Sequence, residues 1–354
     1  MTLLINESEV ENLADMPMAM EAIEDVFRMQ NSGAAINSPR RRVSGGTTTL
    51  QLMGGAVPGL DRIGFKAYVG GVGGARFIVN LYRESTGELD AIIEAGHLGQ
   101  LRTGAASGVS AKLMARPDAG VATIIGSGYQ ARTQLEAVAR VRKLTAARVH
   151  SRDAARREAF AAEMSSKLDL SVVACATGRE ACVGADLIVT ATSSAEPVLA
   201  GDWIEPGAHV MATGANRIQA RELDAAALAS FDLVAADDIG QAKIESGDLT
   251  AAVAAGDFAW EDIVPLADIA AGAVEGRGDP RQRTLYKSLG ITIWDIALAD
   301  RVYRAARAAG AGAAARRAPH ATAQHSTARE SAQNAATGHR PVAGGRRRPT
   351  ADRR

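Results

Sequence analysis

The chain has 354 residues, 47% of them hydrophobic but only 4% aromatic, and its formal net charge is zero. This length accommodates two domains of ordinary size, and the composition predicts an aliphatic, Ala-rich core. A neutral chain argues against a general nucleic-acid-binding or membrane-binding role.

The first part of the chain, residues 1–115, mixes helix and strand patterns. Its acidic N-terminal segment lacks the pattern of a signal peptide. Residues 16–30 have helical spacing after Asp15, and residues 62–71 are typical of a strand. Residues 75–95 predict a hairpin that turns at Ser85–Glu88. Residues 103–115, rich in Gly, Ala and Ser, predict a helix that packs very closely against a neighbour.

From residue 121 the pattern changes to apolar strands that alternate with Ala-rich helices. Strands are predicted at residues 121–125, 147–151, 170–175, 185–192, 209–214 and 232–237. Such alternation with short connections predicts a parallel sheet that is covered by helices on both faces. The fold class is therefore α/β, with a Rossmann-type doubly wound sheet over residues 116–287 and a separate α+β domain before it.

The last long helix and the tail complete the predicted organisation. Ile291, Trp294, Leu298 and Val302 recur at roughly helical spacing, and we expect the helix at 288–310 to rejoin the first domain. Residues 311–354 carry nine Arg and two acidic residues, a net charge of +7, which leaves −7 on the rest. With one large apolar residue, this tail is expected to be disordered. A basic arm that meets an acidic partner is the alternative.

Other sequence features exclude whole classes of site. Cys175 and Cys182 cannot build a disulfide framework, and no Cys/His cluster indicates a metal site. The sequence contains no run of 18 apolar residues. We expect a cytoplasmic protein without a metal, a membrane span or a nucleic-acid partner.

A glycine loop at residues 126–131 carries the first chemical signal. Gly126, Gly128 and Ala131 form a Gly-x-Gly-x-x-Ala pattern that follows a strand and opens a helix. Glycines let the backbone approach a pyrophosphate, and the helix N-terminus offers free N–H groups and partial positive charge. The strand–loop–helix context favours a dinucleotide site over a plain turn.

The end of the second strand of this unit indicates which dinucleotide is bound. Ser151 and Arg152 stand where an acidic residue would hold the ribose 2′-OH of NAD, although Asp153 follows closely. A hydroxyl and a guanidinium suit a 2′-phosphate, so NADP(H) is favoured over NAD(H).

Cationic residues in the first 115 residues suggest a pocket for a small carboxylate. Arg40 lies in a run of three arginines beside a predicted strand, and Lys66 lies inside an otherwise apolar strand. Arg102 and Thr103 precede the small-residue helix. A lysine within an apolar strand is costly to bury unless it is paired.

Taken together, these blocks resemble the ornithine cyclodeaminase/μ-crystallin family. The likeness spans residues 10–310 and rests on SPRRRV, LMGGAVPG, GFKAY, LGQLRTGAASG, IIGSGYQAR, ADLIVTATSS, GAHVMATGANRIQARELD, ESGDL and TLYKSLG. The resemblance implies a homodimer whose first domain binds the substrate and carries the dimer interface. It also implies a Rossmann domain that binds NAD(P)(H).

The resemblance implies roles for individual residues. Arg40 is expected to grip a substrate carboxylate with Lys66 nearby, and Arg102 is expected between the substrate and the nicotinamide. These three are the candidate catalytic residues. The candidate substrate-binding residues are Arg40, Gln51, Met53, Lys66 and Asn216. The candidate cofactor-binding residues are Arg102, Thr103, Gly126, Ser127, Gly128, Gln130, Ala131, Ser151, Arg152, Thr190, Thr192 and Ser193.

Three positions depart from ornithine cyclodeaminases. Gln51 stands where the family has a glutamate, Asn216 where it has the catalytic aspartate, and Ala220 where it has a lysine. Deamination with ring closure needs a base, and neither Asn nor Gln serves as one near pH 7. Reduction of a preformed imine asks only for orientation and a proton.

The favoured hypothesis is therefore an NADPH-dependent ketimine reductase. It would convert Δ1-pyrroline-2-carboxylate or Δ1-piperideine-2-carboxylate to L-proline or L-pipecolate. The alternatives are ornithine cyclodeaminase, an amino-acid dehydrogenase that forms alanine from a 2-oxo acid and ammonia, and a non-catalytic NADPH-binding protein.

Overall fold

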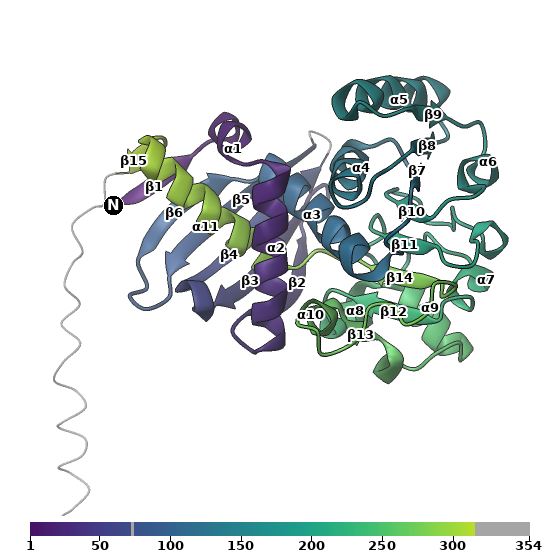
Figure 1. Ribbon diagram of the computed structural model, residues 1–354. Coiled ribbons are helices and arrows are strands. Elements are labelled where there is room, and N and C mark those ends of the chain that lie inside the picture. The colour runs from purple at the N-terminus through teal and green to yellow at the C-terminus, as the bar shows by residue number, and fades with distance from the viewer. Residues whose placement is uncertain (72–73, 316–354) are drawn as a thin grey trace, which may run out of the picture. The chain divides into compact units, whose positions relative to one another are not determined.

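Two β-sheets organise the computed structural model, which describes residues 1–71 and 74–315. The first sheet has seven strands in the order β15-β1-β6-β5-β4-β3-β2, and the second has eight in the order β13-β12-β14-β11-β10-β7-β8-β9 (Figure 1). The α/β fold class expected from the sequence is confirmed. Within the described residues, none of the helices combines the length and hydropathy needed to span a bilayer.

The first sheet is an antiparallel meander with one parallel addition. Its strands are β1 (Thr2–Ile5), β2 (Ile36–Ser44), β3 (Thr49–Val57), β4 (Arg62–Gly71), β5 (Gly74–Arg83), β6 (Leu89–Glu94) and β15 (Ala313–Ala315). The predicted hairpin between β5 and β6 is confirmed. The three consecutive arginines lie within β2 rather than beside a strand, next to a bulge that follows Ser38.

Two helices far apart in the sequence stack on one face of this sheet: the later one packs on β3, β4 and β5, and the earlier one packs on the later (Figure 1). They are α2 (Met16–Asn31), which Asp15 caps as predicted, and α11 (Thr292–Ala309). Phe27 of α2 packs edge-to-face on Trp294 of α11, with ring centroids 5.5 Å apart. The last long helix thus returns to the first sheet, as expected, and it places the buried Asp295 beside that sheet. A short helix, α1 (Glu7–Leu13), lies between β1 and α2.

Helix α3 (Gly96–Met114) joins the two sheets and begins earlier than predicted. Arg102 and Thr103 therefore lie inside this helix and not before it. The reason is a distant partner, because the Glu7 carboxylate accepts hydrogen bonds from the amides of Gly96 and His97 at the helix start. Farther along, a Cβ at Gly104 would lie 2.4 Å from the Thr133 carbonyl oxygen, so glycine is what permits the predicted close packing.

The second sheet is entirely parallel and has the Rossmann order. Its strands are β7 (Val121–Ile125), β8 (Ala146–His150), β9 (Val172–Ala174), β10 (Leu187–Thr190), β11 (His209–Ala212), β12 (Leu233–Ala236), β13 (Val264–Pro265) and β14 (Thr284–Lys287). From β9 to β11 the strands follow the first five places of the 3-2-1-4-5-6 order of dinucleotide-binding sheets. The sixth place is taken by β14, the last of these strands in the chain, with β12 and β13 beyond it. The order reverses between β7 and β10, where ligands of such folds bind.

The helices of this part connect the parallel strands. They are α4 (Tyr129–Val141), α5 (Ala154–Leu168), α6 (Gly178–Cys182), α7 (Ala225–Leu228), α8 (Ile239–Glu245), α9 (Gly247–Ala255) and α10 (Leu266–Ala270). Three short 3₁₀ turns lie at Pro58–Leu60, Gly201–Trp203 and Trp260–Asp262. The core is aliphatic and rich in alanine, as the composition predicts.

The boundary of the C-terminal tail differs from the expectation. Residues 313–315 form β15, which pairs antiparallel with β1 between Thr2 and Leu4. Backbone pairing needs no large side chains, so the composition of the tail did not reveal it. The rest of the predicted disordered tail, residues 316–354, lies outside the described residues.

A buried histidine makes the stability of this fold depend on pH. His209 of β11 is fully buried, with its ring nitrogens 2.8 Å from Thr284 Oγ1 and 3.2 Å from Ser110 Oγ. Burial, together with the charges of Arg277 and Arg142, lowers its pKa from 6.5 to about 3. The folded protein therefore keeps this ring neutral at pH values at which the unfolded chain protonates it.

The contribution of neutral His209 to the free energy of unfolding is fully present above pH 6.5 and is lost as the pH falls toward 3. We expect the wild-type free energy of unfolding to fall by roughly 2 kcal/mol more than that of His209→Gln between pH 6.5 and pH 5. Urea denaturation at both pH values measures this difference. Parallel losses in the two proteins would show that His209 is not the group responsible.

Candidate active site

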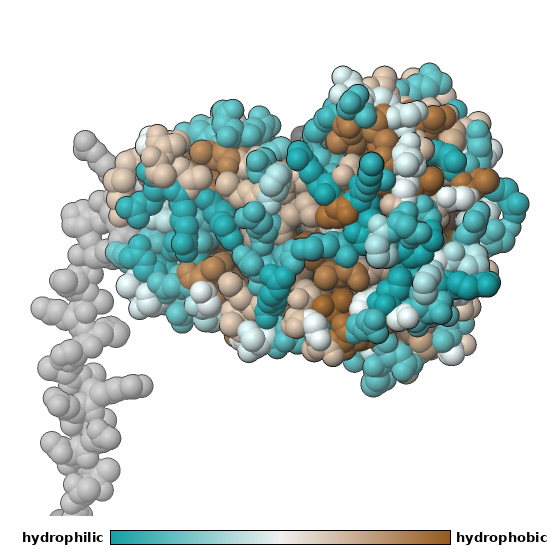
Figure 2. All heavy atoms as spheres, in the orientation of Figure 1, coloured by the Kyte–Doolittle hydropathy of each residue, from teal (hydrophilic) through white to brown (hydrophobic). Residues whose placement is uncertain are grey.

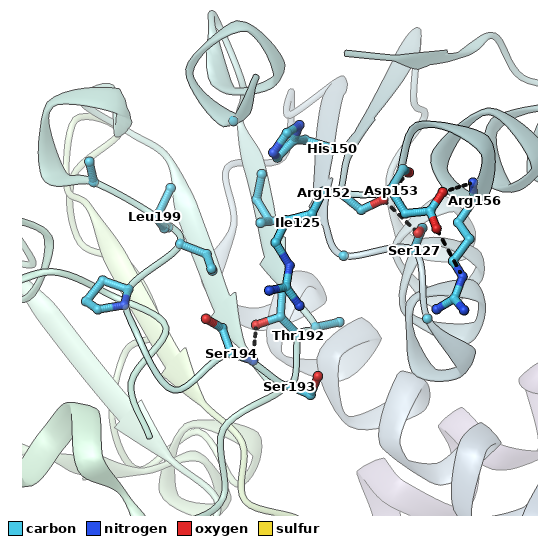
Figure 3. A pocket seen from close by; sticks show the side chains of 18 of the residues that line it. Ile125, Ser127, His150, Arg152, Asp153, Arg156, Thr192, Ser193, Ser194 and Leu199 are labelled. Carbon is cyan, nitrogen blue, oxygen red and sulfur yellow. Dashed lines mark hydrogen bonds and ion pairs between the residues drawn. The ribbon is translucent and has the colours of Figure 1, made fainter. Parts of the chain in front are cut away.

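A first cavity of about 570 Å³ opens at the carboxyl ends of β7, β8 and β10. The glycine loop, Ser151–Asp153 and Thr192–Ser194 line it from three sides (Figure 3). It lies where the strand order reverses, which is the expected position for a dinucleotide.

The glycine loop has the geometry that a pyrophosphate requires. Gly126 has φ +114°, and a Cβ there would lie 2.5 Å from the Ala191 carbonyl oxygen. A Cβ at Gly128 would meet nothing within 4 Å, so this glycine faces open space. The α4 helix starts at Tyr129, and no side chain of the described residues caps its first N–H groups. These N–H groups are available to an anion, and the residues present fit a dinucleotide.

The rim of the first cavity beyond β8 holds the residues that bear on the choice between NAD(H) and NADP(H). Ser151 Oγ lies 2.8 Å from Ser127 Oγ, and both residues line the cavity together with Arg152. Asp153 caps α5 by accepting from the Arg156 amide at 3.0 Å, and it also pairs with the Arg156 guanidinium at 3.5 Å. Figure 3 shows Asp153 turned to Arg156. Its carboxylate is thus engaged within its own helix, whereas Arg152 is exposed in the cavity wall.

A second cavity of about 410 Å³ adjoins the first, since Gly128, Ala191, Thr192 and Ser193 line both. Residues from both sheets and from α3 enclose it. Among the residues singled out in the sequence, it gathers Arg40, Met53, Lys66, Arg102, Thr103, Gln130 and Asn216. Gln51, Thr190 and Ala131 line neither cavity.

The three exceptions have other surroundings. Gln51 is nearly buried and accepts a hydrogen bond of 2.5 Å from the Tyr68 hydroxyl, so it acts on the second cavity through Tyr68. Thr190 is fully buried at the end of β10, and Ala131 is buried in the first turn of α4. In the structure, the small side chain of Ala131 lets α4 pack closely on the sheet.

Lys66 is buried on the inner face of β4 and pairs with the carboxylate of Asp295. Its Nζ lies 2.9 Å from Asp295 Oδ1 and 5.1 Å from the centroid of the Phe77 ring. Burial lowers the pKa of Lys66 to about 8, against the attraction of Asp295 and with the repulsion of Arg102 and Arg40. The lysine is therefore charged at neutral pH but can release a proton more readily than an exposed lysine.

Arg102 reaches the same carboxylate from α3 and keeps unused donors. Its Nε lies 3.2 Å from Asp295 Oδ1, but the N–H is not directed at this oxygen. Nε and Nη1 are both buried without a hydrogen-bond acceptor among residues 1–71 and 74–315. A Cβ at Gly290, which has φ +75°, would lie 2.6 Å from Nη1, so glycine leaves room for the guanidinium. Unused buried donors of a cation are well suited to an anionic ligand.

Arg40 was expected to bind a substrate carboxylate, but its guanidinium is largely engaged by groups of the protein itself. Its Nη1 pairs with Glu245 Oε2 at 2.9 Å, and its Nη2 donates to the carbonyls of Leu289 and Gly290. Its Nε lies 3.3 Å from Met53 Sδ. Arg40 thus lines the cavity with most of its donors engaged, and it ties β2 to α8 beside the cavity.

Sequence reasoning missed the carboxylates that organise these cations. Asp295 and Glu245 are fully buried and hold Lys66 and Arg40. One signal was available for Asp295, which falls four residues after Ile291 and three before Leu298 on the apolar stripe of the last helix. A carboxylate on a buried stripe requires a cationic partner. Glu245 opens the ESGDL block that carries part of the family resemblance, but the sequence does not indicate that Arg40, 205 positions away, is its partner.

Comparison with known proteins gives the context of this site. The model of the ornithine cyclodeaminase/mu-crystallin family matches residues 1–310. A Δ1-pyrroline-2-carboxylate reductase of Bacillus cereus is 35% identical over 257 residues, which cover 72% of this chain and 77% of that protein.

Two solved structures are similar over nearly their whole length. One is Thermococcus litoralis Δ1-pyrroline-2-carboxylate reductase in complex with NADH and L-proline, with a TM-score of 0.85 and 32% identity over 88% of this chain and 100% of that chain. The other is an archaeal alanine dehydrogenase dimer with bound NAD, with a TM-score of 0.83 and 30% identity over 89% and 99%. The protein described here belongs to the ornithine cyclodeaminase/mu-crystallin family.

Proposed function

We propose that this protein is an NADPH-dependent reductase of a cyclic ketimine carboxylate, forming L-proline or L-pipecolate. One observation carries the proposal: Lys66 and Arg102 share a single carboxylate in a buried cavity that adjoins the dinucleotide cavity. The excess positive charge favours an anionic substrate. The relatives named as Δ1-pyrroline-2-carboxylate reductases support the same class of substrate.

The carboxylate of the substrate is assigned to Arg102 and Lys66. Arg102 offers Nε and Nη1, which are buried and unpaired among the described residues. Arg40 closes the cavity at its side and strengthens the positive potential. The apolar surfaces of Met53 and Phe77 suit the methylene groups of a ring. These contacts orient the imine carbon toward the shared wall at Thr192 and Ser193.

Reduction adds a hydride to the imine carbon and a proton to the nitrogen. When bound, the reduced nicotinamide supplies the hydride. Lys66 holds the proton at Nζ, and its lowered pKa of about 8 suits a group that donates at neutral pH. Water is the alternative donor. The glycine loop, Ser151 and Arg152 would hold the cofactor, and a 2′-phosphate would find Arg152 free to bind it.

Ornithine cyclodeamination fits these residues less well. Asn216 lines the cavity where the family has an aspartate, and Gln51 is used as an acceptor for Tyr68. Neither side chain serves as a base. An alanine dehydrogenase remains the second candidate, because one of the similar structures described above has that name.

The homodimer is proposed to form through the free face of the first sheet. Figure 2 shows hydrophilic residues interspersed with apolar ones on the face that carries α2 and α11. Register places Leu52, Ala67 and Ile78 side by side on the opposite face, where Leu52 and Ile78 are exposed. Ile63 and Val69 are exposed on the same face. A second copy of this chain is the occupant that we propose, in line with the dimeric alanine dehydrogenase.

An NADPH-oxidation screen over cyclic ketimine carboxylates and 2-oxo acids, with and without ammonium, tests the activity. We expect Lys66→Met to lower kcat/KM for the cyclic imine by about 100-fold or more, because it removes both a proton donor and a carboxylate contact. The affinity for NADPH, measured by fluorescence, should stay nearly unchanged, and the exposed Lys143→Met is the matched control. Turnover of pyruvate that requires ammonium would instead favour the dehydrogenase. Release of ammonia from ornithine would favour the cyclodeaminase, and no turnover would favour a binding protein.

The pKa of Lys66 also predicts the pH dependence. The ammonium form is needed for turnover and is lost as the pH rises through about 8. We expect kcat/KM for imine reduction to fall above this pH in the wild type. In Lys66→Arg the guanidinium stays charged, so the residual activity should hold to higher pH. The same alkaline decline in both proteins would assign it to another group.

Cofactor preference is tested at the rim of the first cavity. We expect Arg152→Ala to weaken NADPH binding by roughly 10-fold or more, because a charge-assisted contact with the 2′-phosphate is lost. NADH binding should be almost unchanged. Arg140→Ala makes the same charge change at the far end of α4 and is the control. An equal loss for both cofactors would contradict the assignment of Arg152 to the 2′-phosphate.

A further inference from the structure

We propose that Glu222 is a positioning residue that fixes the place of the nicotinamide end of the cofactor. It would do so by joining the loops after β10 and β11, from an anchor formed by Asp248 and Lys287. The inference rests on the proposed dinucleotide site but adds a device that neither cavity contains, because Glu222 itself lines neither.

The Glu222 carboxylate is fully buried and accepts four hydrogen bonds from two loops. Oε1 accepts from the amide and the hydroxyl of Thr192, at 2.9 and 2.8 Å. Oε2 accepts from the amides of Gly214 and Ala215, at 2.7 and 3.0 Å. One side chain thus sets the distance between the segment after β10 and the segment after β11.

These two loops border the part of the site where the nicotinamide would lie. Ser151, which is assigned to the adenosine end, follows β8 on one side of the glycine loop. Thr192 follows β10 on the other side and lines both cavities, and Gly214 lines the second. A Cβ at Gly214 would lie 2.2 Å from the Thr192 carbonyl oxygen, so the loops are held in direct contact.

Glu222 is itself anchored by a buried ion pair. Asp248 Oδ1 accepts from the amides of Glu222 and Leu223 at 2.8 and 3.1 Å. Asp248 Oδ2 pairs with Lys287 Nζ at 2.9 Å, and both side chains are fully buried. Lys287 ends β14 and precedes Ser288, which lines the substrate cavity. The chain of contacts therefore runs from β14 through α9 to the loops at the junction of the two cavities.

The ionic form of Glu222 is essential to this arrangement. Its two oxygens face three backbone N–H groups and one hydroxyl, so both must accept. In Glu222→Gln one oxygen becomes an NH₂ group, and in either orientation this group faces at least one backbone N–H. The result is a lost hydrogen bond and a separation of the loops, while the glycine loop and the β8 rim keep their contacts.

The test compares the whole cofactor with its adenosine half in the full-length protein. Adenosine 2′,5′-bisphosphate lacks the nicotinamide, and NADPH carries it. We expect Glu222→Gln to weaken NADPH binding by about 10-fold or more. The affinity for the bisphosphate should change little, because the hydrogen bonds of Glu222 hold only the loops after β10 and β11, where the nicotinamide would lie. Turnover should also show a larger primary isotope effect with deuterated NADPH, since hydride transfer becomes slower than the other steps. The exposed Glu196→Gln is the control.

A second variant removes the anchor without leaving a buried charge. Asp248→Asn combined with Lys287→Met should shift binding and isotope effect in the same direction, and it carries the test if Glu222→Gln fails to fold. Equal weakening of both ligands, or of neither, would overturn the inference. If the wild type binds neither the bisphosphate nor NADPH, the proposed dinucleotide site fails instead.

Discussion

The cavity proposed to bind the substrate depends on one buried carboxylate that two cations share. Asp295 Oδ1 lies 2.9 Å from Lys66 Nζ and 3.2 Å from Arg102 Nε, and Asp295 is fully buried. Two buried cations against one anion are costly, and a second anion offsets that cost. A substrate carboxylate would be that anion. Burial keeps the pKa of Lys66 below that of an exposed lysine, and the neighbouring cations Arg102 and Arg40 lower it further, while Asp295 acts in the opposite direction.

The architecture brings these charges next to the cavity proposed for the cofactor. Lys66 comes from a strand of the first sheet, Arg102 from α3, and Asp295 from α11, which follows the last strand of the second sheet. Arg40 and Glu245 join the two sheets at the side of the cavity. Because a segment from near each end of the described chain contributes, the site is complete only when both sheets are assembled.

Much of the fold could be predicted from the sequence, since strand alternation and the glycine loop are local patterns. The Rossmann order, the hairpin and the return of α11 are confirmed by the structure. The start of α3 was wrong because its cap, Glu7, lies far away in the chain. The strand β15 was not predicted, because its backbone pairing with β1 leaves no side-chain pattern in an Ala-rich tail. In the site, the cations Arg40, Lys66 and Arg102 could be identified from the sequence. Their pairing with Asp295 and Glu245 could not, because it depends on long-range packing. The roles of the site residues stay predictions.

The most direct measurement is a crystal structure of the protein with NADP⁺ and L-proline or L-pipecolate. The account predicts that the product carboxylate lies at about 3 Å from Arg102 Nε or Nη1, with Lys66 beside it and the ring facing the nicotinamide. A product bound elsewhere, or a complex in which Arg102 and Lys66 contact only Asp295, would contradict the central claim.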